Sequence, residues 1–233
     1  MNLKLFELGK VFYQKEKSSL PTEKFMLGGV ICGLRTEESW NLPREEVDFY
    51  DLKGAIENLF QALFIDKVKF QADNSIPYLH TGIAARIIVN ERPLGVIGEV
   101  HPHVLDYFEI SKKIFVFEID FGEIISYGGK RRKILEPLPK FPPVYRDVAL
   151  VVNMDTESHE IEEVITESKV RYLQEVKVFD VYQGAPIPDG KKSLAYRLKF
   201  QSPDRSLTDE EVNAYYEKIL SHLNKKLEVE LRS

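Results

Sequence analysis

The chain has 233 residues with 43% hydrophobic and 30% charged side chains and a net charge of −5, a globular composition that excludes a disordered or fibrous protein. No apolar run approaches the ~20 residues that a bilayer span needs, and the N-terminal segment lacks the apolar core and cleavage site of a secretory signal. The single cysteine, Cys32, allows no internal disulfide and no cysteine-cluster metal site, so we expect a soluble cytoplasmic protein.

The first half of the chain is predicted to be a mixed α+β module with an antiparallel sheet. Asp48 precedes residues 49–64, whose apolar side chains recur at helical spacing and predict an amphipathic helix. Apolar, β-branched runs predict strands at 84–89, 94–100 and 114–119. Gly95 and Gly98 lack the spacing of a nucleotide-binding loop, so they are interpreted as strand glycines that permit close packing.

A proline-rich segment marks the expected domain boundary. Four of the twelve prolines fall between Pro137 and Pro143, just after the basic triplet at 131–133. Proline removes backbone donors and disfavours helix in the residue before it, so residues 130–147 predict an extended, semi-rigid linker. We therefore expect domains at residues 1–135 and 140–233.

The second half predicts the element order β-α-β-β-α-β. Apolar runs predict strands at 147–153, 173–182, 193–201 and 229–231. Helical periodicity predicts helices at 158–169 and from Thr208 onward, where Glu211 stands at capping-box spacing. This order is the ferredoxin-like pattern, in which two helices cover one face of a sheet and leave the other face open.

The open face of that sheet is the predicted binding surface. The strand at 193–201 alternates strictly, which places on the open face Ser193, Ala195, Arg197 and Lys199. On the preceding strand, Phe179 and Val181 are the predicted core pair, which turns Asp180 and Tyr182 outward. A ring, a carboxylate, a hydroxyl and two cations suit single-stranded RNA, because the ring stacks on a base, polar groups read its edge and cations meet phosphate. An exposed strand tyrosine is also typical of a residue that is simply a good β-former.

Charge is unevenly distributed along the chain. Residues 169–199 carry seven basic and three acidic side chains, whereas residues 157–167 carry five glutamates and no lysine or arginine. A basic segment within an acidic chain indicates either an anionic partner or an ordinary solvated strand surface.

Candidate catalytic motifs are weak. The His-Pro-His triplet at 101–103 is interpreted as a turn after a strand, because no cysteine or acid pair nearby completes a metal-ligand set. Two carboxylate pairs, Asp51/Glu57 and Glu45/Glu46, are interpreted as solvated positions that flank a helix. The sequence contains no P-loop, G-x-S-x-G or H-E-x-x-H motif. It therefore predicts no catalytic residue, no metal site and no self-contained active site.

Several ordered motifs resemble one known family. Four segments of the second half lie at 141–149 (FPPVYRDVA), 179–184 (FDVYQG), 192–195 (KSLA) and 208–212 (TDEEV). Together they strongly resemble the C-terminal ferredoxin-fold anticodon-binding domain of bacterial phenylalanyl-tRNA synthetase β subunits. The end of the same subunit's class II synthetase-like core module is resembled at 6–12 (FELGKVF), 48–54 (DFYDLKG) and 98–102 (GEVHP). The resemblance spans essentially the whole chain and implies a C-terminal fragment of that subunit. One departure is the segment 80–83 (HTGI), where the family usually has a His-Pro-Gly-Arg-like turn.

The resemblance implies a component of an aminoacyl-tRNA synthetase, a ligase of protein biosynthesis. A catalytic α subunit would carry the ATP and phenylalanine site, and the core-like β module would help to build an αβ heterotetramer. The chain has no G-x-G-x-E-R segment, whose arginine would hold ATP phosphates. ATP and Mg²⁺ are thus expected in the complete enzyme and not in this fragment, which also lacks the upstream editing module.

The resemblance also implies which residues contact RNA. Tyr182 would stack on the first anticodon base of phenylalanine tRNA, Asp180 would accept hydrogen bonds from a guanine edge, and Ser193 would add a polar contact. Arg197 and Lys199 are our own additions as phosphate contacts.

Two other functions are left open by the sequence. The order β-α-β-β-α-β also describes amino-acid-sensing regulatory modules, which bind ligands through a glycine-bearing turn after the first strand. Here that turn, residues 153–157, is acidic and has no glycine, which counts against this function. The other is a purely structural role in assembly with the α subunit.

Overall fold

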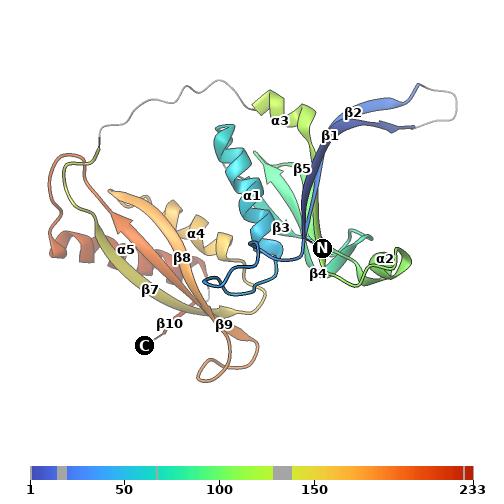
Figure 1. Ribbon diagram of the computed structural model, residues 1–233. Coiled ribbons are helices and arrows are strands. Elements are labelled where there is room, and N and C mark those ends of the chain that lie inside the picture. Colours follow the sequence, from blue (N-terminus) through green and yellow to red (C-terminus); the bar gives the residue numbers. More distant parts are fainter. Residues whose placement is uncertain (1, 15–19, 67, 128–137, 228, 233) are drawn as a thin grey trace. The chain divides into compact units, whose positions relative to one another are not determined.

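The computed structural model describes residues 2–14, 20–66, 68–127, 138–227 and 229–232 (Figure 1). The chain divides into two compact units, residues 1–134 and 135–233, which we call the N-terminal and the C-terminal unit. Residues 130–137 of the predicted linker lie outside the described residues, and residues 138–143 form neither helix nor strand. Among the described helices, none has the length and apolar character needed to cross a membrane.

The N-terminal unit is built on a six-stranded antiparallel sheet in the order β1-β2-β6-β5-β4-β3, which confirms the predicted antiparallel sheet. Its strands are β1 (Leu3–Tyr13), β2 (Thr22–Cys32), β3 (Val68–Ala72), β4 (Leu79–Val89), β5 (Arg92–Val100) and β6 (Ile114–Asp120). Its helices are α1 (Phe49–Ala62), α2 (Pro102–Tyr107) and α3 (Phe121–Tyr127). The sequence predicted α1, β4, β5 and β6, and missed the rest.

Two local features stabilise helix α1: a capping box at its N-terminus and an apolar stripe that packs on the sheet. The Asp48 carboxylate accepts from the backbone N–H of Asp51 (3.0 Å), and the Asp51 carboxylate accepts from the N–H of Asp48 (2.8 Å). Leu52, Ile56 and Phe60 recur every four residues and are buried against the sheet. Burying each contributes about 1.5–3 kcal/mol.

The structure corrects two interpretations of the N-terminal unit, at the His-Pro-His triplet and at Asp51. The His-Pro-His triplet begins α2 instead of forming an extended turn: Pro102 takes the first helical position, and the His101 ring Nδ1 accepts from the N–H of His103 (3.2 Å). Residues 80–83, where the family usually has a turn, are part of β4, at a register irregularity between Leu79 and Ala84. Asp51 is also more than a solvated carboxylate, since it pairs with Arg35 (2.9 Å).

Gly95 lets β5 and β6 approach closely, as the sequence predicted. It pairs with Ile119, and a Cβ at position 95 would lie 2.2 Å from the Glu118 carbonyl oxygen and 2.8 Å from the Ile119 Cα. Both are backbone atoms, so relief would require the strands to move apart. Gly54 in α1 is the opposite case, because a Cβ there meets nothing within 4 Å.

The C-terminal unit has the predicted order β-α-β-β-α-β, which is confirmed. Its elements are β7 (Val144–Asn153), α4 (Ser158–Glu167), β8 (Leu173–Tyr182), β9 (Lys191–Phe200), α5 (Asp209–Lys226) and β10 (Glu230–Leu231). The strands form an antiparallel sheet in the order β10-β7-β9-β8, the ferredoxin-like arrangement. The fold class is therefore α+β in both units.

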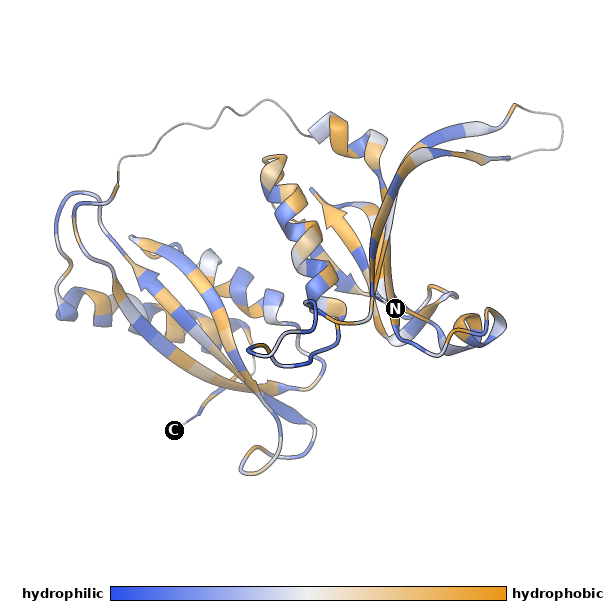
Figure 2. Ribbon diagram, in the orientation of Figure 1, coloured by the Kyte–Doolittle hydropathy of each residue, from blue (hydrophilic) through white to orange (hydrophobic). Residues whose placement is uncertain are grey.

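Both helices of the C-terminal unit pack on the same face of its sheet (Figure 1). Figure 2 shows hydrophobic and hydrophilic residues alternating along these strands. The inward residues of β9 are fully or nearly fully buried, and they are those predicted: Leu194, Tyr196, Leu198 and Phe200. They meet Ile161 of α4 and Ile219 of α5 in one core. Burial raises the pKa of the Tyr196 phenol, whose hydroxyl donates to the Ser158 carbonyl (3.2 Å).

Helix α5 begins at the predicted capping box. The Thr208 hydroxyl accepts from the N–H of Glu211 (3.3 Å), and the Glu211 carboxylate accepts from the N–H of Thr208 (3.1 Å). The same carboxylate pairs with Arg205 (2.7 Å). The Arg205 hydrogen bond, followed by that of the Thr208 N–H, lowers the pKa of Glu211 to about 2.

We expect Gly95→Ala to destabilise the N-terminal unit by about 1–3 kcal/mol or more, because the new methyl overlaps backbone atoms of β6. Gly54→Ala is the matched control. It should stabilise the protein by about 0.5–1 kcal/mol, because the methyl fits and helix propensity rises. Urea unfolding followed by circular dichroism measures both. Equal effects of the two substitutions would contradict the close approach at Gly95.

We expect the stability cost of Glu211→Gln to depend on pH. A carboxyl whose pKa is lowered in the folded state stabilises it above the unfolded value of about 4.3, and this contribution is lost as the pH falls towards 2. The difference in unfolding free energy between wild type and Glu211→Gln should therefore shrink between about pH 7 and about pH 3. Urea titrations at both pH values test this, and a constant difference would contradict it.

Candidate nucleic-acid interface

The open face of the C-terminal unit is the face of its sheet that α4 and α5 leave uncovered. Residues directly opposite each other in antiparallel strands point to the same face. The register pairs Tyr182 with Ser193, Asp180 with Ala195, and Lys177 with Arg197. Because β9 buries its alternate residues in the core, all of these residues belong to the open face.

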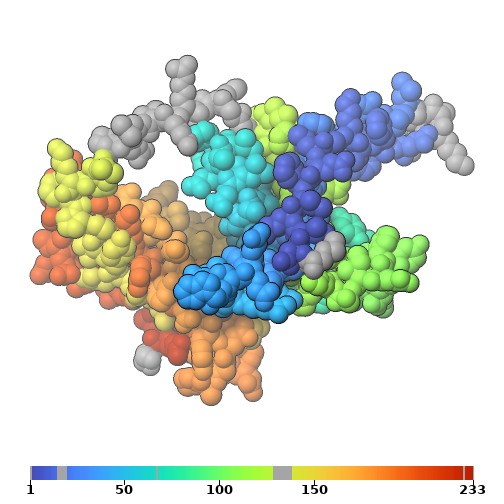
Figure 3. Space-filling view, viewed as in Figure 1, coloured from blue at the N-terminus to red at the C-terminus, as the bar shows by residue number. Residues whose placement is uncertain are grey.

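Tyr182 is held in place at the end of β8. Its hydroxyl donates to the Ala185 carbonyl (2.5 Å), and its side chain is 37% exposed. Ala185 belongs to the turn of residues 183–190, which projects as an orange lobe in Figure 3. Ile187 is buried in that turn and donates its N–H to the Gly184 carbonyl (2.9 Å), so the turn that anchors Tyr182 is itself folded.

Arg232 reaches the same ring from the other edge of the sheet. Its guanidinium carbon lies 4.9 Å from the centre of the Tyr182 ring. The backbone N–H of Arg232 donates to the Ala149 carbonyl (2.9 Å), next to the pairing of β10 with β7. Ala149 is opposite Ala195, so small side chains lie between the two edges and leave room for the long arginine. The contact is a cation–π interaction.

Ser193 differs from the prediction. It lies opposite Tyr182 on the open face, yet it is only 2% exposed. It lies between Tyr182 of β8 and Val151 of β7, and long side chains flank it: Arg232 lies on the Tyr182 ring, and Lys191 pairs with Glu230 (2.8 Å). A short hydroxyl between such side chains is covered, so Ser193 is not a surface contact in this structure.

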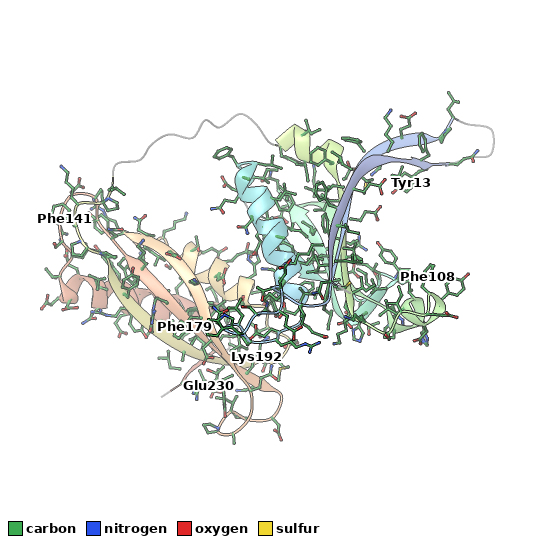
Figure 4. The ribbon with its side chains drawn as sticks, viewed as in Figure 1. Tyr13, Phe108, Phe141, Phe179, Lys192 and Glu230 are labelled. Atoms are coloured by element: carbon green, nitrogen blue, oxygen red, sulfur yellow. The ribbon has the colours of Figure 1, made fainter. Side chains whose placement is uncertain are left out.

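Phe179 was predicted in the core and is instead 49% exposed. The register of β8 shifts between Val178 and Asp180, so Phe179 is the extra residue of a β-bulge. Val176 and Val178 keep the core side, and the ring of Phe179, labelled in Figure 4, turns to the open face. There the guanidinium carbon of Arg197 lies 5.0 Å from the centre of the ring. The prediction was wrong because a bulge reverses the alternation of a strand.

Val181 also differs from the prediction. It lies opposite the buried Leu194, so it points to the helix-covered side, but it is 56% exposed because β8 is an edge strand. The expected core pair of Phe179 and Val181 therefore does not exist. Asp180 is exposed on the open face.

Arg197 forms an ion pair with the carboxylate of Asp147. Its Nε and Nη2 donate to the two oxygens of Asp147 at 2.8 and 2.7 Å, a fork-shaped pair between neighbouring strands. The hydrogen bond from Arg197 lowers the pKa of Asp147, and the hydrogen bond to Asp147 raises that of Arg197. The Arg197 side chain therefore has a fixed direction. A phosphate that binds Arg197 must share the guanidinium with the Asp147 carboxylate.

A groove of about 640 Å³ surrounds this pair. It is lined by Tyr145, Arg146, Asp147, Glu175, Lys177, Phe179, Arg197 and Lys199. Three cations (Lys177, Arg197 and Lys199), two carboxylates and two aromatic rings thus meet in one depression of the open face. The guanidinium of Arg146 instead donates to Asp209 and Asn213 of α5, on the helix-covered side.

The five predicted site residues fall into two groups. Asp180, Tyr182 and Ser193 share one end of the open face, whereas Arg197 and Lys199 line the groove. Ser193 and Lys199 are six residues apart on β9, about 20 Å at ~3.4 Å per residue. One base cannot contact both Ser193 and Lys199, whereas Asp180 and Arg197 are diagonal neighbours across β8 and β9.

Two family models match the chain. Residues 1–121 match the model described as phenylalanyl tRNA synthetase beta chain CLM domain, and residues 139–232 match the ferredoxin-fold anticodon binding domain. The chain belongs to the phenylalanyl-tRNA synthetase beta chain family. The predicted family resemblance is thereby confirmed.

The curated relatives that the chain matches are named phenylalanine–tRNA ligase beta subunits. The phenylalanine–tRNA ligase beta subunit of Moorella thermoacetica is 43% identical over 228 residues, and that of Syntrophotalea carbinolica is 39% identical over 231 residues. These alignments cover 98% and 99% of this chain but only 28% and 29% of the relatives. Among solved structures, a pyrrolysyl-tRNA synthetase from Desulfitobacterium hafniense is 15% identical, with a TM-score of 0.39 over 53% of this chain and 40% of that one.

In this member of the phenylalanyl-tRNA synthetase beta chain family, sequence reasoning missed several residues of the open face. Among them are Phe179, Tyr145, Lys177 and Arg232. The adjacent apolar residues Val178 and Phe179 break the alternation of β8 and could have indicated the bulge. Nothing local indicates Arg232, because its contact joins opposite edges of the sheet.

We expect Arg232→Ala to expose the Tyr182 ring, because the guanidinium that covers part of it is removed. The measurement is nitration of tyrosines by tetranitromethane, followed by peptide mass spectrometry. Modification of Tyr182 should become faster in the variant, while that of the exposed Tyr145 in the same molecule stays unchanged. An unchanged rate at Tyr182 would show that Arg232 does not cover the ring in solution.

Proposed function

We propose that the open face of the C-terminal unit holds the anticodon of phenylalanine tRNA, as part of a phenylalanine–tRNA ligase. The observation that carries this is a partly exposed, anchored tyrosine beside an exposed carboxylate, in a unit that matches an anticodon-binding family. The match covers nearly all of that unit, which disfavours the amino-acid-sensing alternative.

Tyr182 is the proposed stacking ring for the first anticodon base. Its hydroxyl bond to Ala185 fixes the ring before RNA arrives, so little side-chain freedom is lost on binding. Arg232 stays stacked in this proposal and leaves the remaining ring surface to the base. Stacking on an aromatic side chain is worth about 1–3 kcal/mol per base.

Asp180 is the proposed reader of that base. An ionised carboxylate only accepts hydrogen bonds, and guanine offers ring N–H and amino donors on one edge. Asp180 lies two residues from Tyr182 on the same face, within reach of a base stacked there. For Ser193 to add its proposed contact, the side chains that cover it must first move aside.

Arg197 and Lys199 are proposed to meet the RNA backbone away from the first base. Lys199 makes no ion pair with any described residue, so its charge is available to phosphate. Arg197 keeps its pair with Asp147 and presents its remaining donors. These contacts would add affinity without sequence preference.

The N-terminal unit is proposed to support assembly with a catalytic α subunit in an αβ heterotetramer. It exposes large apolar side chains, among them Phe6, Phe12, Trp40, Tyr107 and Phe108. These side chains are candidates for the contact with the α subunit. In the edge strand β1, Phe6 and Phe12 also adjoin unpaired backbone groups.

ATP and Mg²⁺ are assigned in this proposal to the α subunit of the complete enzyme, which works in the cytoplasm. Among the described residues, no group of three or more His, Cys, Asp or Glu side chains is arranged to hold a metal ion. This chain would contribute RNA binding and assembly, and no catalytic residue.

We expect Tyr182→Ala to weaken binding of a phenylalanine anticodon stem-loop by about 5- to 150-fold, the loss of one stacked base. The full 233-residue chain is titrated with the fluorophore-labelled stem-loop at fixed low salt. A matched stem-loop that lacks the first-position guanine should bind wild type more weakly than the intact stem-loop does. Tyr182→Ala should lower the affinity for this second RNA by little more. Asp180→Asn should reduce the preference for guanine by about 10- to 150-fold, the loss of a charge-assisted hydrogen bond.

Tyr107→Ala is the matched control, since it removes an exposed tyrosine of the N-terminal unit. It should leave binding unchanged. Equal binding of both RNAs by wild type, Tyr182→Ala and Asp180→Asn would reduce the interaction to nonspecific electrostatics. The assembly role would then be the better account of this chain.

A further inference from the structure

We propose that the groove around Phe179 is a second nucleotide subsite, which takes another base of the same RNA strand whose first anticodon base lies on Tyr182. This inference rests on the proposed function, because it needs a strand held at Tyr182. It gives a role to Phe179, Lys177 and Glu175, none of which the first base would use.

The exposure of Phe179 is the first support. Its neighbours on β8, Val176 and Val178, pack in the core, and only the bulge turns its ring outward. Bulges often re-aim a side chain beside a binding site. A phenyl ring that is half exposed on a sheet face is apolar surface that a stacked base would cover.

The position of Arg197 is the second support. Its guanidinium lies on the Phe179 ring at 5.0 Å and is held in one direction by both oxygens of Asp147. RNA bases stack on arginine guanidinium planes as well as on aromatic rings. Ring and guanidinium together are therefore a preformed platform, with no side chain left to order when a base binds.

The charges of the groove fit a nucleotide. Lys177 lies opposite Arg197, and Lys199 lies opposite Glu175 and Tyr145. Within the described part of the chain, neither lysine ammonium makes an ion pair, so both are available to the phosphates on either side of a base. The carboxylate of Glu175 is an acceptor for a base amino group.

Size and spacing also fit. The groove encloses about 640 Å³, within the range of about 300–1,000 Å³ that small-ligand sites occupy. Phe179 and Tyr182 are three residues apart on one strand, about 10 Å at ~3.4 Å per residue. Unstacked nucleotides of one strand cover such a distance, so both rings can hold bases of one loop.

The test is a set of double-mutant cycles with the full chain. Wild type, Phe179→Ala and Tyr182→Ala are titrated with the anticodon stem-loop and with versions that carry an abasic residue at each loop position in turn. Phe179→Ala should weaken binding of the intact RNA by about 5- to 150-fold. This loss should vanish for one abasic position other than the first, and persist when the first position is abasic.

Phe108→Ala is the matched control, because it removes an exposed phenylalanine of the N-terminal unit (Figure 4). It should leave all affinities unchanged. Lys177→Gln and Lys199→Gln should each reduce the slope of log affinity against log salt by about 0.7, as expected for one phosphate contact with a single strand. Thermal unfolding checks that Phe179→Ala remains folded, and Phe179→Leu, which keeps apolar bulk without a ring, should lose most of the affinity as well.

Two results would overturn the subsite. If Phe179→Ala binds the intact RNA like wild type, or loses the same factor with every abasic RNA, no base docks at Phe179. In either case, coupling of Tyr182→Ala to the first position would still support the proposed function. Loss of that coupling as well would overturn both proposals.

Discussion

The binding surface of this protein depends on one-sided coverage of the four-stranded sheet by α4 and α5. Because both helices pack on one face, every second residue of β9 goes into the core and its neighbours go to the other face. The side chains of that second face do not pack against α4 or α5, and aromatic and charged residues collect there, with Ser193 buried among them. Substitutions on the open face can therefore change its chemistry without changing the packing of the core.

Electrostatic pairs give that face its order. The Asp147–Arg197 pair joins β7 to β9, and Lys191 with Glu230 joins β9 to β10. These pairs are partly exposed, and pairs of this kind contribute little to stability. Their larger effect is to fix the direction of long side chains, so that Arg197 lies on Phe179 and the surface has a defined shape before any ligand is present.

Much of the fold and part of the site could be predicted from the sequence. The strict alternation of β9 and the capping box at Thr208 are local signals, and both were read correctly. Phe179 was misplaced because a bulge is an extra residue, and strict alternation carried through it assigns the wrong face. The contact of Arg232 with Tyr182 and the burial of Ser193 depend on strands far apart in sequence, so no local pattern reports them.

Strand β10 has only two residues, and it holds Arg232 beside Ala149. A two-residue strand at the edge of a sheet opens at much lower free energy than the core of a domain. Amide hydrogens of β10 would therefore exchange with solvent by local opening while those of β7 and β9 stay protected. The cover on the Tyr182 ring would follow the same local equilibrium, so the ring would alternate between a capped and an uncapped state without any unfolding of the sheet beneath it.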